Sequence, residues 1–179
     1  MLHEIIIAGF GGQGVMSMGQ LIAYSGMHEE KNVSWLPSYG PEQRGGTANC
    51  SVIISDEPIG SPLISKPTIV IVLNRPSFDK FEPLVAPGGF LIVNSSLIDK
   101  KSTREDITVI EIPATQLSVD IGEPRVSNSI ILGAFIKLSK AVSLDSVVEA
   151  LKKVLPERRH NLIPINKVAL ENGVDFVSR

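Results

Sequence analysis

The chain has 179 residues, of which 43% are hydrophobic and 20% charged, and its formal net charge is −2 at pH 7. This composition is ordinary for a globular protein, and the small net charge excludes the strongly basic surface typical of nucleic-acid-binding domains. No apolar run approaches the roughly 20 residues that span a bilayer, and residues 1–4 carry no basic segment of a secretory signal. We therefore expect one domain over residues 1–179, with no contact to nucleic acid or membrane.

Apolar segments rich in Val, Ile and Leu alternate along the chain with stretches whose apolar residues recur at helical spacing. Nearly continuous apolar runs are typical of parallel strands that are covered on both faces. The predicted strands are residues 4–8, 33–36, 48–55, 68–73, 89–93 and 108–112. The predicted helices are residues 15–27, 77–85, 127–140, 144–155 and 165–172, and Gly173 is expected to end the last one as a left-handed cap. This alternation predicts an α/β fold: a mostly parallel sheet with helices on both faces, a Rossmann-like three-layer sandwich.

The first predicted strand runs into a glycine-rich turn. Gly9, Gly11 and Gly14 match the pattern G-x-G-x-x-G, and the first predicted helix begins directly after them. Such a turn lets the backbone approach an anion, and the helix adds N–H groups that carry about half a positive charge. A dinucleotide site also needs an acid at the end of the second strand to hold the ribose, and residues 33–36 run into Pro37-Ser38-Tyr39 instead. Besides a contact with the phosphate of another ligand, two interpretations of the turn remain: a stand-alone nucleotide-binding module, and a tight turn that binds no ligand.

A second glycine-rich loop, SYGPEQRGGTA, occupies residues 38–48. Within it, the Arg44 guanidinium can form paired hydrogen bonds to a phosphate or a carboxylate, while the N–H groups of Gly45 and Gly46 stay accessible. Arg44 could instead be solvated or paired with Glu42, which would add at most about 1 kcal/mol of stability. Tyr39 either stacks against a ligand ring or a partner protein, or packs as a core aromatic.

These motifs resemble those of a known enzyme family. The segments AGFGGQGV and PSYGPEQRGGTANCSVIIS, followed by DEPIGSP, are similar to the gamma subunit of 2-oxoacid:ferredoxin oxidoreductases, whose members act on pyruvate, 2-oxoglutarate or branched-chain 2-oxoacids. Later segments, among them KFEPLVAPGGFLIVNSSLI, SNSIILGAF and NKVALENG, follow the family's order, so the resemblance covers almost the whole chain. It implies a CoA-dependent oxidative decarboxylation of a 2-oxoacid, in which CoA is a co-substrate.

That reaction requires thiamine diphosphate with Mg²⁺ and iron–sulfur clusters, and this sequence carries neither signature. Its single cysteine cannot hold a cluster, and it has no Gly-Asp-Gly followed by paired asparagines. The resemblance therefore implies that these cofactors lie in partners: thiamine-binding alpha and beta subunits and a ferredoxin-like delta subunit. We expect the isolated chain to bind none of them and to be inactive, with no catalytic or metal-ligating residue of its own.

The two glycine-rich loops are expected to form one surface. They follow the strands at residues 4–8 and 33–36, which we expect to be neighbouring parallel strands, and ligands bind at the carboxyl ends of such strands. We expect this surface to contact the phosphates of CoA or a partner subunit, or to serve as a scaffold without a ligand. The candidate residues are Gly11, Gly12, Gln13, Gly14, Tyr39, Arg44, Gly45 and Gly46.

The helix predicted at residues 127–140 is apolar on almost every side, which is typical of a buried helix. We expect Ser127 or Asn128 to cap its N-terminus and its apolar face to meet another subunit, so that the isolated chain forms a homodimer. Gln13 is expected either to donate an amide hydrogen bond from the glycine-rich turn or to cap the helix that follows it.

The remaining residues with reactive side chains are expected to be structural. Cys50 lies in the predicted strand 48–55 and should pack as a small apolar group, and a single cysteine places the protein in a reducing cytoplasm. His3, His28 and His160 show no ligand or triad spacing, so we assign them structural or surface roles.

Overall fold

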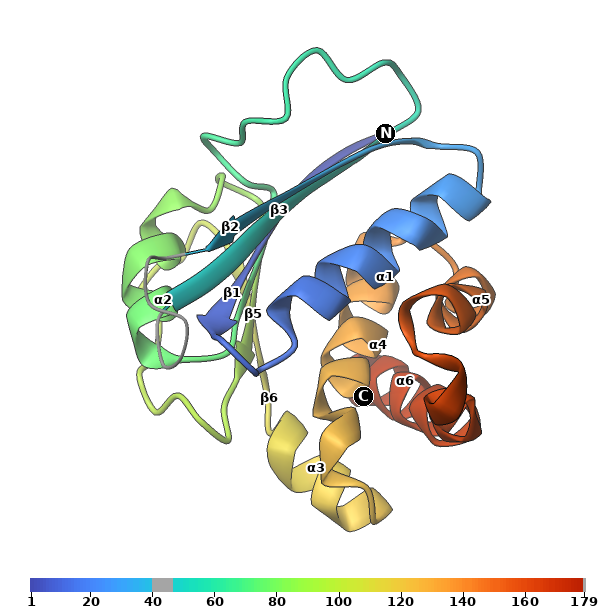
Figure 1. The fold of residues 1–179 in the computed structure, drawn as a ribbon. Helices are drawn as coiled ribbons and strands as arrows, with labels where there is room; N and C mark the ends of the chain where they lie inside the picture. The colour runs from blue at the N-terminus through green and yellow to red at the C-terminus, as the bar shows by residue number, and fades with distance from the viewer. Residues whose placement is uncertain (40–46, 179) are drawn as a thin grey trace.

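A six-stranded sheet forms the centre of the molecule. The computed structural model describes the backbone of residues 1–39 and 47–178 (Figure 1). Its strands are β1 (Leu2–Phe10), β2 (Asn32–Tyr39), β3 (Thr47–Ser55), β4 (Ile69–Val72), β5 (Phe90–Asn94) and β6 (Thr108–Ile112). They lie in the order β2-β3-β1-β4-β5-β6, and β1, β4, β5 and β6 are parallel. The predicted mostly parallel α/β sheet is confirmed, and each predicted strand is present with its ends moved by a few residues.

The placement of β2 differs from the prediction. β3 is antiparallel to both β1 and β2 and lies between them, so the strands that precede the two glycine-rich loops are not neighbours. The reason is the short connection at residues 40–46, because parallel neighbours need a crossover of a dozen or more residues. The chain therefore returns as an antiparallel strand, which takes the place next to β1.

Helices cover both faces of the sheet, and they do so unequally (Figure 1). The helices are α1 (Val15–His28), α2 (Arg75–Phe81), α3 (Ala114–Ile121), α4 (Ser127–Ser139), α5 (Leu144–Val154) and α6 (Ile163–Ser178), with 3₁₀ turns at Glu82–Leu84, Pro124–Val126 and Glu157–Leu162. α1 and α3–α6 lie on one face, whereas α2 and the 3₁₀ turn after it lie on the other. The short helix α3, which follows Pro113, was not predicted.

The alternation of side chains along the strands builds two cores. Ile5 and Ile7 of β1 point toward α1 and α4, whereas Ile6 and Ala8 point toward Phe78 of α2. All five are 5% exposed or less. At roughly 25 cal/mol per Å² of buried apolar surface, these two cores provide most of the stability of the fold.

The apolar helix α4 is covered from within the chain. Nine of its 13 residues are buried, and α6 packs directly against it. A Cβ atom at Gly133 would overlap the carbonyl group of Leu170, and one at Gly173 would overlap that of Ile130. Gly173 therefore lies inside α6 and permits close helix packing, so its predicted role as a left-handed cap is wrong. The expectation that α4 offers its apolar face to another subunit is also wrong.

Candidate functional site

The candidate site lies where the parallel part of the sheet changes direction. β1 and β4 are adjacent, but the chain leaves β1 toward α1 on one face and leaves β4 toward α2 on the other. In open α/β sheets, ligands bind at the carboxyl ends of the strands next to such a point. The first glycine-rich turn, at residues 11–14, lies at this position.

The backbone of the turn is held by Gln13. Gly12 and Gly14 adopt φ values of +92° and +78°, in a region that residues other than glycine rarely adopt. The Gln13 N–H donates to the carbonyl of Phe10 at 3.1 Å, and its side-chain Oε1 accepts from the Phe10 N–H at 2.6 Å. Its Nε2 donates to the carbonyl oxygen of Leu73 at 3.1 Å. Of the two roles predicted for Gln13, the structure has the donated hydrogen bond, and this bond ties the end of β1 to the end of β4.

Asn128 fixes the turn from the side of α4. Its Nδ2 donates to the carbonyl oxygen of Gln13 at 2.9 Å, and a Cβ atom at Gly14 would overlap its amide group. The predicted capping by Ser127 or Asn128 is wrong, because the 3₁₀ turn Pro124–Val126 runs straight into α4 and Val126 holds the cap position. No spacing in the sequence could indicate this contact, since the two residues are 115 positions apart.

A hollow of about 270 Å³ opens beside the turn, and we call it the crevice. Its lining residues come from five segments: Gly12, Gln13, Leu73, Asn94, Leu97, Thr115, Pro124, Arg125, Ser127 and Asn128. Asn94 is buried at the end of β5; its Nδ2 donates to Thr115 Oγ1 at 3.1 Å and its Oδ1 accepts from the Ser96 N–H at 3.2 Å. The lining therefore combines uncharged polar side chains with the apolar side chains of Leu73, Leu97 and Pro124, and one of its residues is charged.

Arg125 is the one cationic side chain among the residues that line the crevice. It is 68% exposed and pairs with Glu123, with Nε 2.7 Å from Oε1 and Nη2 2.8 Å from Oε2. The hydrogen bonds from the Arg125 side chain and backbone lower the pKa of the Glu123 carboxyl group to about 2. Sequence analysis missed Asn94, Thr115 and Arg125, because none of them belongs to a recognisable motif.

Three helices begin at the crevice, and only α1 starts there without any side-chain cap. In α3 the Gln116 N–H donates to Ser96 Oγ at 3.2 Å, and the 3₁₀ turn that leads into α4 is capped by the Glu123 side chain. The cap positions of α1, α3 and α4 are Gly14, Pro113 and Val126, and no acidic residue lies in the first turn of these helices. In contrast, α2 and α5 are capped by the side chains of Asn74 and Ser143. Uncapped N-termini carry unpaired N–H groups and a partial positive charge. The N-terminus of α1 is therefore the part of the crevice that is suited to an anionic group that needs main-chain donors.

The other predicted site residues are only partly placed. Gly11 is exposed beside Gly12, with open space around its Cα atom. Tyr39 ends β2, and its backbone lies in register with Ala48 and, through Ala48, with Gly9. The side chain of Tyr39 and the residues Arg44, Gly45 and Gly46 lie outside the described part of the chain.

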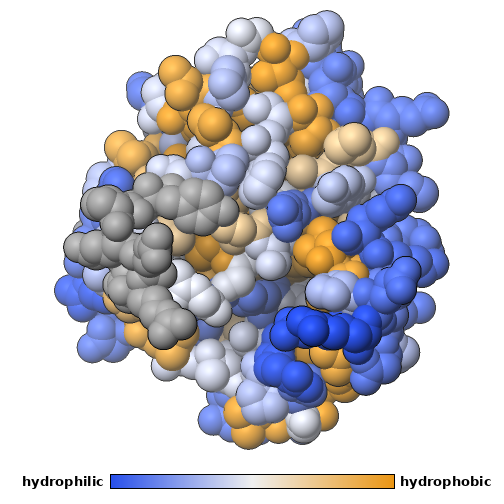
Figure 2. Space-filling view, in the orientation of Figure 1, coloured by the Kyte–Doolittle hydropathy of each residue, from blue (hydrophilic) through white to orange (hydrophobic). Residues whose placement is uncertain are grey.

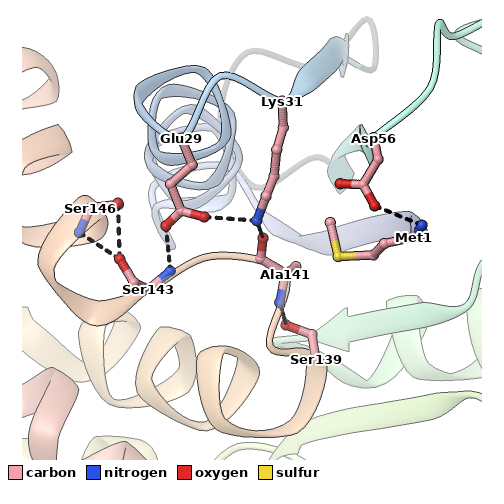
Figure 3. A network of polar contacts seen from close by, with 8 residues as sticks. All are labelled: Met1, Glu29, Lys31, Asp56, Ser139, Ala141, Ser143 and Ser146. Carbon is pink, nitrogen blue, oxygen red and sulfur yellow. Dashed lines mark hydrogen bonds and ion pairs between the residues drawn. The ribbon is translucent and has the colours of Figure 1, made fainter.

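A second polar cluster lies at the other end of α1, and we call it the Glu29 cluster (Figure 3). Glu29 accepts from Lys31 Nζ at 2.7 Å and from the Ser143 N–H at 2.6 Å, and Lys31 also donates to the carbonyl of Ala141 at 2.5 Å. Partial burial raises the pKa of Glu29, but these hydrogen bonds outweigh it and lower the pKa to about 2. Each charged group in the cluster has a partner, so the cluster connects α1 to the start of α5 and is structural.

Cys50 and His160, which the sequence analysis takes as structural, lie in contacts within the chain. Cys50 is fully buried against Gly19 and Trp35, and burial raises the pKa of its thiol to about 12. His160 Nε2 lies 3.0 Å from the carbonyl oxygen of Leu155. Over the described residues, no three His, Cys, Asp or Glu side chains come together as metal ligands would, and no helix has the length and apolar character of a membrane span.

Comparison with known proteins decides the family. The family model for pyruvate ferredoxin/flavodoxin oxidoreductase matches residues 4–176, which is nearly the whole chain. The chain belongs to this family. The predicted resemblance is thereby confirmed.

Two members of this family were compared with the chain by sequence identity and by the share of each protein that the match covers. Ketoisovalerate oxidoreductase subunit VorA of Methanothermobacter marburgensis is 37% identical over 177 residues, which are 98% of this chain and 37% of VorA. The chain thus spans little more than a third of that relative. The 2-oxoglutarate synthase subunit KorC of Methanocaldococcus jannaschii is 35% identical over 172 residues, 93% of this chain and 92% of KorC.

A solved structure of this family has the same fold. The gamma subunit of a keto/oxoacid ferredoxin oxidoreductase from Geobacter sulfurreducens superimposes with a TM-score of 0.82 at 28% identity, and the match covers 98% of each chain. VorA and the Geobacter protein are named as oxidoreductase subunits and KorC as a 2-oxoglutarate synthase subunit. KorC and the Geobacter subunit correspond to this chain over nearly their full length.

Proposed function

We propose that this chain is the gamma-type subunit of a cytoplasmic 2-oxoacid:ferredoxin oxidoreductase. The complete enzyme would convert a 2-oxoacid, CoA and oxidised ferredoxin into an acyl-CoA, carbon dioxide and reduced ferredoxin. The observation that carries this proposal is the match to KorC over 92% of that subunit and to the Geobacter gamma subunit over 98%. Thiamine diphosphate, Mg²⁺ and the iron–sulfur clusters would be held by alpha, beta and delta subunits.

The role we propose for this subunit is to help bind CoA at the crevice. CoA carries phosphates, and the crevice combines the uncapped N-terminus of α1 with the Arg125 guanidinium, which would exchange part of its pairing with Glu123 for the phosphate. Gly11, Gly12, Gln13 and Gly14 would supply the turn, and Tyr39, Arg44, Gly45 and Gly46 would add the second loop.

A dinucleotide site is the competing proposal, and the strand order weighs against it. With β3 inserted, the end of β2 lies two strand spacings, about 10 Å, from the end of β1. In a dinucleotide-binding fold the neighbouring parallel strand carries the ribose-binding acid. In addition, the Gln13 side chain bridges β1 and β4 across the switch point.

The test uses the whole complex. The tagged chain should co-purify with its partner subunits, and the complex should reduce ferredoxin or a dye in a reaction that needs both 2-oxoacid and CoA. Arg125→Gln should raise the apparent KM for CoA about tenfold, since a charge-assisted phosphate contact contributes roughly 1.5–3 kcal/mol, and should leave the KM for the 2-oxoacid unchanged. Arg158→Gln, on the exposed 3₁₀ turn Glu157–Leu162, is the matched control.

Two outcomes would overturn this proposal. An unchanged CoA requirement in the Arg125→Gln complex would remove the CoA role of the crevice. Stabilisation of the isolated chain by NAD(P) or FAD would favour the nucleotide-binding module, because a ligand at 100 times its dissociation constant adds about 2.7 kcal/mol to the unfolding free energy.

A further inference from the structure

The two edges of the sheet differ in how they are protected. β6 has five residues, and its Glu111 side chain forms an ion pair with Lys101. β2 has eight residues, NVSWLPSY, and none of them is charged. Short length and charged side chains discourage an edge strand from pairing with another chain. By this criterion β6 is protected, whereas β2 is open to pairing.

One residue of β2 limits pairing with an added strand, and this residue, Pro37, lies near the C-terminal end of the strand. Pro37 has no N–H group, so an added strand gains little beyond this residue. The residues before it, 32–36, can donate and accept in the usual way. Across the described part of the chain, β2 pairs with β3 and with no second strand, so the main-chain groups on its outer side have no strand partner.

An apolar groove runs directly beside this edge. It is a hollow of about 270 Å³ between α1 and β2, lined by Gln20, Ala23, Tyr24, Met27, Val33 and Trp35. Tyr24 is 43% exposed and Met27 60% exposed. In the space-filling view, apolar side chains are most frequent over the upper part of the molecule, where the loop after β3 lies above the strands, and hydrophilic ones dominate on the side of α5 (Figure 2).

The free edge and the groove together define the kind of partner. Unpaired main-chain groups along a strand are satisfied by another extended strand, and alternate side chains of that strand point to one face. A helix could fill the groove but would leave the β2 main chain unpaired. We infer that β2 receives an extended strand from another subunit of the assembly, with an apolar side chain of that strand inserted between α1 and β2.

This inference rests on the proposed function, because the assembly supplies the strand. VorA includes the region that matches this chain as 37% of a longer polypeptide, so in that relative further chain segments are joined to the same fold. A partner subunit is therefore the source that we assign to the strand, in preference to a second copy of this chain.

Amide hydrogen exchange of the assembled complex tests the added strand. Alternate amides of residues 32–36 point away from β3, and these should exchange more slowly in the complex than in the isolated chain, by about tenfold or more, while those of β6 should change little. Met27→Glu, which places a carboxylate in the groove, should weaken binding of the partner about tenfold or more. Val119→Glu is the matched control, since Val119 is a 50% exposed apolar residue on α3. The melting temperature of each isolated variant shows that it folds.

Each remaining outcome contradicts a different statement. If the active complex forms but the β2 amides exchange as fast as before, the strand addition is wrong and the proposed function stands. If these amides become protected in the isolated chain as its concentration rises, a second copy is the occupant and the assignment to a partner subunit is wrong. If no oxidoreductase complex forms with the wild-type chain, the proposed function fails and this inference fails with it.

Discussion

The two ends of helix α1 carry polar groups that serve different purposes. At its C-terminal end, Glu29, Lys31 and Ser143 satisfy one another's charges and hydrogen bonds (Figure 3). At its N-terminal end, Gly14 leaves the helix uncapped, and Gln13 and Asn128 hold the turn from behind.

The difference separates stability from binding. Polar groups that already have partners inside the chain stabilise the fold and have little left to offer a ligand. Main-chain N–H groups that are positioned but unpaired contribute nothing to stability, and they can bind an incoming anion without rearrangement. Changes at the Glu29 cluster should therefore lower stability and spare activity, whereas changes at the crevice should do the reverse.

The largest loss of stability is expected for Glu29→Gln. This change removes the carboxylate that pairs with Lys31, whose side chain is only 19% exposed, and it weakens the bond from the Ser143 N–H. The free energy of unfolding should fall by about 2 kcal/mol, since hydrogen bonds to charged groups contribute about 1.5–3 kcal/mol. Urea unfolding measures it, with Glu105→Gln as the exposed control. Equal losses in both variants would mean that the Glu29 cluster does not stabilise the fold.

The contribution of Glu29 should also depend on pH, with a somewhat smaller amplitude. Its pKa in the folded chain, about 2, lies below the ordinary value of 4.5, so the stabilisation is complete above pH 4.5 and disappears as the pH falls from 4.5 toward 2. We expect about 1–2 kcal/mol over this range, because the side chain is partly exposed. The difference in unfolding free energy between wild type and Glu29→Gln, measured at pH 6 and pH 3, should shrink accordingly. A constant difference would mean that the ionisation of Glu29 does not stabilise the fold.

The smallest effect on stability is expected at the crevice. Asn128→Ala removes one hydrogen bond of 2.9 Å to a main-chain carbonyl and should cost about 1 kcal/mol. If the crevice binds CoA, the released turn should lower the CoA-dependent activity of the complex about tenfold. Asn172→Ala removes an equivalent 2.9 Å bond within α6 and should leave activity unchanged. Identical activities of the two variants would show that the position of the turn is unimportant.

The elements of the fold could be predicted because the sequence encodes them locally. The strands of the parallel sheet are buried on both faces and stand out as runs such as IVIV in β4. The order of the strands could not be predicted in the same way. It depends on β3 pairing with both β1 and β2, and the hydrophobic pattern of β3 is compatible with either direction.

The errors in the prediction share one physical cause, which is contact between distant segments. Gly173 follows a helical stretch and resembles a cap, but it is needed inside α6 because Ile130 lies against it. Asn128 follows a serine at the start of a helix and resembles a cap, but its amide reaches the turn at Gln13. The glycine-rich turn itself was located correctly because its function depends on local backbone geometry. The other residues that line the crevice, among them Asn94, Thr115 and Arg125, come together only in three dimensions.

The packing of α6 on α4 also determines when this protein can finish folding on the ribosome. The glycines that bring the two helices together, Gly133 and Gly173, are 40 residues apart. At a synthesis rate of about 5–20 residues per second, Gly133 is added roughly 2–8 seconds before Gly173. During this interval Ile130 and its neighbours lack the helix that covers them. The nascent chain should therefore present an apolar helix to chaperones late in its synthesis, after the strands of the sheet have already been made.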